Sequence, residues 1–122
     1  MTNTTLIEQL NWRYATKKMD AEKAVPQEKV DAIINAALMA PTSSGTQPFE
    51  LIVVTNPDVR ADIRKAAGDQ TPITDGSHLL VFAAWDTYTE ARIDEVAQLN
   101  VDARGDLPLI HQYYGNLKAS YV

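Results

Sequence analysis

The 122-residue sequence contains no cysteine, only two histidines, and fewer basic than acidic residues. Without cysteine the chain can form neither a disulfide nor a thiolate metal site, and with only His78 and His111 as imidazole ligands we expect no metal centre. The net charge of −5 argues against a nucleic-acid surface or a polybasic membrane patch. No apolar run approaches membrane-spanning length, and the N-terminus lacks the basic end and apolar core of a signal peptide. We therefore expect a cytoplasmic protein.

The length predicts one domain over residues 1–122, and the spacing of the apolar residues predicts several helices and two strands. A capping box of Thr5 and Glu8 predicts a first helix over 6–13, and a second capping box of Thr87 and Glu90 predicts a polar helix that ends near Arg104. Further helices are expected over 26–40, 58–67 and 109–122, and strands over 49–55 and 78–85.

The strands are few for this number of helices. A pair of strands alone is marginal in water, and the last helix reaches Val122 without a capping residue. We therefore expect the chain to be the front part of a longer protein, or to need a partner that completes its core.

A basic cluster stands out before the second helix, in "WRYATKKMD". Arg13 and Lys17 are four residues apart, so they lie on one side of the chain in either a helical or an extended segment. An anion between them would relieve their mutual repulsion, and the fork of an arginine suits a phosphate. On charge alone, a solvated basic patch that includes Lys18 is the favoured interpretation.

The segment "APTSSGTQPFELIVVT", residues 40–55, places small hydrogen-bonding residues directly before a strand. Gly45 lets the backbone approach a ligand closely, and the hydroxyl and amide groups around it could bind one. The alternative is an ordinary helix-to-strand connection built from common turn residues, which the segment alone favours.

Together, "RYATKKMD", the helix that follows it and "APTSSGTQPFELIVV" resemble the nitroreductase family of flavin-dependent oxidoreductases. "GDQTPITDGSHLLVFAA" and "ARGDLP" extend the resemblance, in order, over essentially the whole chain. The resemblance implies an α+β sandwich with FMN as cofactor, and an intertwined homodimer with flavin at the subunit interface. It also implies ping-pong transfer of a hydride from NAD(P)H to nitroaromatics, quinones or related acceptors. No side chain is required as a catalyst.

The resemblance also implies a set of cofactor-binding residues, namely Arg13, Tyr14, Ala15, Lys17, Pro41, Thr42, Ser43, Gly45 and Gln70. Arg13 and Lys17 would hold the FMN phosphate and ribityl chain, and Lys17 would also reach the pyrimidine edge of the ring. Pro41, Thr42, Ser43 and Gly45, in the loop of small residues, would approach the flavin from the partner subunit. Gln70 would face the flavin ring or the nicotinamide. Ala15 departs from a frequent serine of the family, which removes one hydroxyl contact.

Two other functional hypotheses stay open at this point. One is a non-catalytic half-domain that dimerises or binds a nucleotide without turnover. The other is a plain α+β domain whose basic cluster and loop are incidental. His78 and His111 are expected to have packing or surface roles, because no pattern in the sequence pairs either with a carboxylate.

Overall fold

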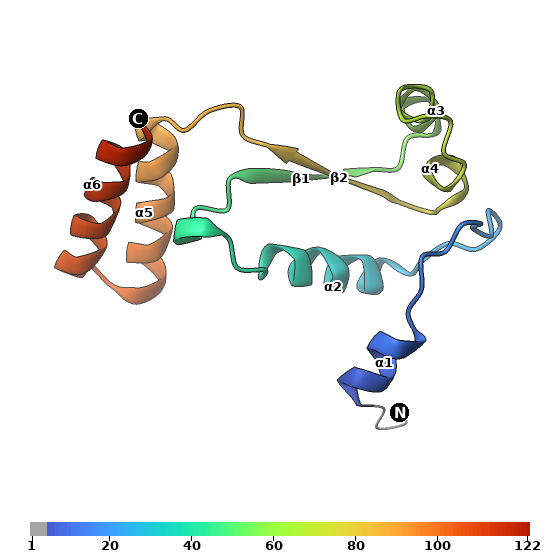
Figure 1. Ribbon diagram of the computed structural model, residues 1–122, viewed down its shortest axis with the longest axis horizontal. Helices are drawn as coiled ribbons and strands as arrows, with labels where there is room; N and C mark the ends of the chain where they lie inside the picture. The colour runs from blue at the N-terminus through green and yellow to red at the C-terminus, as the bar shows by residue number, and fades with distance from the viewer. Residues whose placement is uncertain (1–4) are drawn as a thin grey trace. The chain divides into compact units, whose positions relative to one another are not determined.

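The computed structural model describes residues 5–122 (Figure 1). These residues divide into two compact units. The first unit combines the N-terminal segment up to Gln27 with Val53–Leu80, and the second combines Glu28–Ile52 with Val81–Val122. Within the described residues, no helix is long and apolar enough to cross a membrane. The expectation of one domain over 1–122 stays a prediction.

In the first unit, helix α1 (Leu6–Trp12) begins where the sequence predicts it. The Thr5 hydroxyl accepts a hydrogen bond from the Glu8 amide, and the Glu8 carboxylate accepts one from the Thr5 amide at 2.6 Å. The capping box is therefore confirmed, and these bonds lower the pKa of Glu8. The helix ends one residue before the predicted Arg13, and residues 13–20 are irregular.

Helices α3 (Pro57–Ala66) and α4 (Pro72–Asp75) complete the helical part of the first unit. Asn56 caps α3, because its side-chain oxygen accepts from the amides of Asp58 and Val59. Gly68 adopts a left-handed φ of +66° just after α3, a conformation typical of a glycine that follows a helix end. Helix α4 was not predicted, because its single turn lies within a run of turn-forming residues.

Strands β1 (Phe49–Val54) and β2 (Leu79–Ala84) form a two-stranded sheet. They run antiparallel, since the amide of Trp85, just after β2, donates to the carbonyl of Pro48, just before β1. Both strands are where the sequence predicts them. The rings of Phe49 and Phe82 contact each other across the pair in a tilted arrangement, with centroids 5.5 Å apart.

The second unit contains most of α2 (Gln27–Leu38) and the helices α5 (Glu90–Arg104) and α6 (Pro108–Tyr121). Helix α2 starts one residue after Pro26, and its first residue, Gln27, still belongs to the first unit. Helices α5 and α6 lie side by side as a hairpin (Figure 1). An ion pair between Lys118 and Asp94 joins them. The buried apolar side chains of the described residues, Val30, Ile93 and Tyr114, come from α2, α5 and α6.

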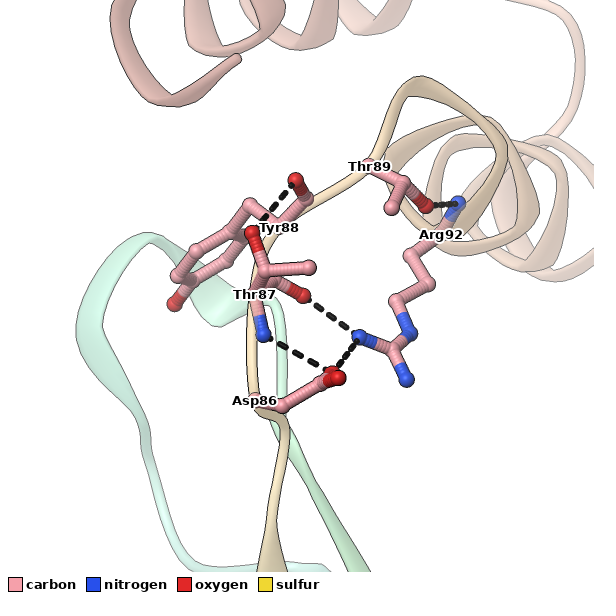
Figure 2. A network of polar contacts seen from close by, with 5 residues as sticks. All are labelled: Asp86, Thr87, Tyr88, Thr89 and Arg92. Carbon is pink, nitrogen blue, oxygen red and sulfur yellow. Dashed lines mark hydrogen bonds and ion pairs between the residues drawn. The ribbon is translucent and has the colours of Figure 1, made fainter.

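The N-terminus of α5 corrects the predicted capping box. The cap is Thr89, whose hydroxyl accepts from the Arg92 amide at 3.2 Å (Figure 2). Thr87 instead donates its hydroxyl to the Tyr88 carbonyl, and its amide donates to the Asp86 carboxylate. The Thr-x-x-Glu pattern was misleading because Thr87 and Thr89 are both suitable caps, and the backbone turns into the helix only after Thr89.

Candidate functional site

The basic cluster lies in the irregular segment after α1. Arg13 and Lys17 are exposed, and within residues 5–122 neither side chain forms an ion pair or a hydrogen bond. Tyr14 is 71% exposed beside them, and Ala15 is exposed too. By contrast, Lys23 in the same segment pairs with Asp20 at 3.2 Å. Arg13 and Lys17 therefore keep their full hydrogen-bonding capacity for an anion.

Gln70 lies in the same unit, on the turn between α3 and α4. Asp69 has a left-handed φ of +56°, and the Arg64 guanidinium holds its carboxylate at 2.7 Å. This ion pair fixes a backbone conformation that a non-glycine residue seldom adopts. The Gln70 side chain is exposed and has no hydrogen-bond partner among the described residues.

The small-residue loop, Thr42–Gln47, lies in the second unit and forms a tight turn with a short 3₁₀ helix over Ser43–Gly45. Its backbone visits the left-handed region at Ser44 (φ +57°), Gly45 (φ +66°) and Gln47 (φ +44°). Such conformations cost free energy for residues other than glycine, of the order of 1 kcal/mol each. The loop therefore needs contacts that hold it in place.

Most of the loop's polar side chains provide those contacts and are not free for a ligand. The Thr42 hydroxyl accepts from the Gln47 amide at 2.9 Å, and the Gln47 side chain donates to the Leu38 carbonyl. Thr46 is 1% exposed, and its hydroxyl donates to the Ser43 carbonyl at 3.3 Å.

Three tyrosines from outside the loop also hold it. The Tyr121 hydroxyl lies 3.0 Å from the Ser44 hydroxyl, and the Tyr113 hydroxyl donates to the Ser44 carbonyl at 3.5 Å. The Tyr88 hydroxyl lies 3.4 Å from the Thr46 hydroxyl. Sequence reasoning missed these contacts, because the tyrosines lie between 42 and 77 residues further along the chain.

A small exposed surface in the loop, together with Pro41 just before it, remains available to a ligand. Pro41, Ser43 and Gly45 are exposed, and the Ser43 hydroxyl has no described partner. A Cβ placed on Gly45 would meet no atom within 4 Å, so its positive φ, and not crowding, calls for glycine there. The open backbone at Gly45 leaves room for the close approach of a planar group.

The residues present therefore fit a flavin nucleotide in kind. Unpaired cations suit its phosphate, and an open glycine, a free hydroxyl and a free amide suit its ring and ribityl groups. The first group of residues, 13–17 and Gln70, belongs to the first unit, and Pro41, Thr42, Ser43 and Gly45 belong to the second.

The surroundings of the two histidines correct one expectation, that neither is paired with a carboxylate. His111 does have a carboxylate partner, since its Nε2 lies 2.5 Å from Oδ1 of Asp106, and both side chains are largely exposed. The pair was not predicted, because Asp106 lies before the helix and His111 lies within it. His78 lies 3.0 Å from the Ser77 hydroxyl. Among residues 5–122, no cluster of His, Asp and Glu side chains could hold a metal ion.

Comparison with known proteins decides the family. The model of the nitroreductase family matches residues 10–117, a range that includes the basic cluster, the small-residue loop and Gln70. This chain belongs to the nitroreductase family. The oxygen-insensitive NAD(P)H nitroreductase of Salmonella typhimurium is 32% identical over 102 residues, which are 79% of this chain and 47% of that protein.

Solved structures of the nitroreductase fold agree with this membership. A nitroreductase-like protein from Streptococcus mutans superimposes with a TM-score of 0.74 at 16% identity, over 95% of this chain and 58% of that one. The enone reductase CLA-ER, described as acting in gut-bacterial fatty acid saturation, gives 0.72 at 15% identity over 99% of this chain and 59% of its own. The fold is thus the nitroreductase-like α+β fold. The chain spans 37% to 47% of the length of the curated relatives it matches.

Proposed function

We propose that this chain carries part of the FMN site of an NAD(P)H-dependent oxidoreductase. The observation that carries the proposal is the family match over residues 10–117, which contains every residue that the resemblance assigns to the cofactor. FMN, when bound, supplies hydride chemistry between NAD(P)H and an acceptor such as a nitroaromatic or a quinone. The proposal follows the names of relatives such as the Salmonella enzyme.

In this proposal, the residues of the chain bind and orient the cofactor. Arg13 donates its guanidinium fork to the phosphate, and Lys17 supplies a second charge along the ribityl chain. The Ser43 hydroxyl and the open backbone at Gly45 contact the ring system, and Gln70 offers its amide to the ring or the nicotinamide. No side chain acts as a nucleophile, and acceptor and reductant take turns at one site, which gives ping-pong kinetics.

We also propose that the functional protein is a homodimer with the flavin at the subunit interface. Large apolar side chains on α1 are exposed in support of this, including Leu6 at 69%, Ile7 at 65% and Trp12 at 82%. Exposed apolar area of this kind favours burial against another surface. A cytoplasmic location stays a prediction.

Flavin titration tests the proposal. The fluorescence of FMN is followed while the protein is added, first as the wild type and then as the double variant R13Q/K17Q. We expect the double variant to bind FMN at least about tenfold more weakly, because charge-assisted hydrogen bonds to the phosphate are lost. The double variant K23Q/K29Q removes the same charge from exposed positions outside the proposed site and serves as the matched control.

Equal FMN affinity of R13Q/K17Q and the wild type would refute the assigned roles. NADH oxidation with a quinone as acceptor then separates enzyme from binding protein. Flavin retention without turnover would favour the alternative of a non-catalytic half-domain.

A further inference from the structure

A second feature, separate from the residues proposed to hold the phosphate, is a pocket in the second unit. It has a volume of about 570 Å³ and is lined by residues of α5, α6 and the small-residue loop: Ser44, Gly45, Asn100, Arg104, Leu109, Ile110, Tyr113 and Tyr114. A pocket of this size suits a small organic ligand. None of its lining residues is acidic, in a protein whose net charge is −5.

One asparagine organises the polar part of this pocket. The Asn100 oxygen accepts from Nη1 of Arg104 at 2.7 Å. Its Nδ2 donates to the Tyr114 hydroxyl at 2.9 Å and to the Val96 carbonyl at 3.0 Å. Asn100 therefore spends both of its amide hydrogens within the protein, and it fixes Arg104 and Tyr114 on either side of itself.

Both fixed groups keep donors for a ligand. The Tyr114 oxygen already accepts a bond from Asn100, and among residues 5–122 no acceptor takes the phenol proton. Tyr114 is 7% exposed, and this burial raises its pKa, so the proton stays on the oxygen at neutral pH. Arg104 forms no ion pair with a described acidic residue, and most of its N–H groups are unused. A guanidinium and a phenol proton next to each other are complementary to a carboxylate.

The remaining lining is apolar and aromatic. Leu109 is 71% exposed and Tyr113 is 44% exposed, although both line the pocket. The Tyr113 ring packs edge-on against Tyr114, with centroids 5.2 Å apart and an interplanar angle of 84°. A rigid ring, beside leucine and isoleucine side chains, favours a flat apolar ligand body.

We propose that this pocket binds a planar aromatic carboxylate, whose carboxylate accepts from Arg104 and the Tyr114 hydroxyl while its ring packs on Leu109, Ile110 and Tyr113. Asn100 is a positioning residue that presents the two donors. Because Ser44 and Gly45 also line the pocket, such a ligand contacts the small-residue loop.

The test compares benzoate with benzamide, which has the same shape but no charge. Both are titrated into the protein without added flavin, and binding is followed through the backbone amide signals of ¹⁵N-labelled protein by NMR. We expect benzoate to bind about tenfold more tightly than benzamide, and its shifts to centre on residues 100–114. Because no flavin is present, the result does not depend on the proposed oxidoreductase activity.

Variants then assign the contacts. R104Q should weaken benzoate about tenfold and benzamide much less, since it removes the guanidinium charge that complements the carboxylate. Y114F should weaken benzoate by a smaller factor, and it keeps the buried ring, so the fold is preserved. K29Q on α2 carries the same charge change and should have no effect. Benzoate that binds no better than benzamide, or that loses no more affinity in R104Q than in K29Q, overturns the proposal.

Discussion

The buried arginine of α3 gives a sharp test of how the first unit is held together. Arg60 is 7% exposed. Its guanidinium donates to the carbonyls of Ile73 at 2.8 Å, Thr74 at 2.9 Å and Ser77 at 3.4 Å, and also to that of Gly76. The group thus ties α3 to the whole segment that leads into β2. Replacing Arg60 by methionine keeps the length of the stem and removes every one of these bonds.

The expected cost follows from these contacts. A hydrogen bond from a charged donor contributes about 1.5–3 kcal/mol when its loss leaves the acceptor unpaired. Residues 72–80 are half-buried, so water can reach part of the released carbonyls. The methionine side chain also retains the apolar contacts of the stem. We therefore expect R60M to lower the free energy of unfolding by about 3–5 kcal/mol, a large part of the stability of a typical domain.

Urea unfolding followed by far-UV circular dichroism measures this loss from the shift of the midpoint. R64M is the matched control. Arg64 is 27% exposed and donates to the Thr74 hydroxyl at 3.0 Å and to the carboxylate of Asp69, which is 81% exposed, so its loss should cost clearly less, about 1–2 kcal/mol. R60K, which keeps the charge but not the planar fork, should fall between them and decides the matter if R60M fails to fold. An R60M protein no less stable than R64M would refute the reasoning.

Two further predictions concern the start of α5. T89A should lower the free energy of unfolding by about 1 kcal/mol, because the Arg92 amide loses its hydrogen-bond acceptor. T87A should lower it clearly less. Equal losses of the two variants in urea unfolding would contradict the assignment of Thr89 as the cap. The pKa of Asp86 lies below its ordinary value of 3.8, mainly because its carboxylate accepts a hydrogen bond from Arg92. The ionised carboxylate therefore stabilises the fold above the pKa of the unfolded state, and this stabilisation is lost as the pH falls through the pKa of the folded state. The wild type should therefore lose more stability than D86N between neutral and acidic pH, and parallel urea midpoints of the two across that range would be evidence against the ion pair.

The sequence predicted the helices and strands well, because most of their signals are local. The Thr5–Glu8 box, Gly68 and Pro108 mark their element ends through contacts or conformations within a few residues. The failure at Thr87 is also local: two threonines compete for one role, and side-chain pattern alone does not report which residue has the extended backbone of a cap.

The candidate site can be proposed from the sequence where it depends on residue type, but not where it depends on contacts between residues distant in the chain. Arg13, Lys17 and Gly45 are visible as motif residues, and their exposure agrees with a binding role. The spacing of Asn100 and Arg104 by one helical turn could have suggested their bond. The approach of Tyr114 to Asn100, and of Arg60 to Gly76, depends on how separate elements pack, which no short-range pattern encodes.

The contact of Tyr121 with the small-residue loop has a consequence for biosynthesis. Ser44 and Tyr121 are 77 residues apart, so during translation the loop leaves the ribosome well before the tyrosine that holds it. At synthesis rates of about 5–20 residues per second, that interval is roughly 4 to 15 s. Until then the left-handed turn at Ser44 and Gly45 lacks its contact with Tyr121. A nascent chain paused or cleaved before the last turn of α6 would therefore carry every residue of the loop without the contact between Ser44 and Tyr121.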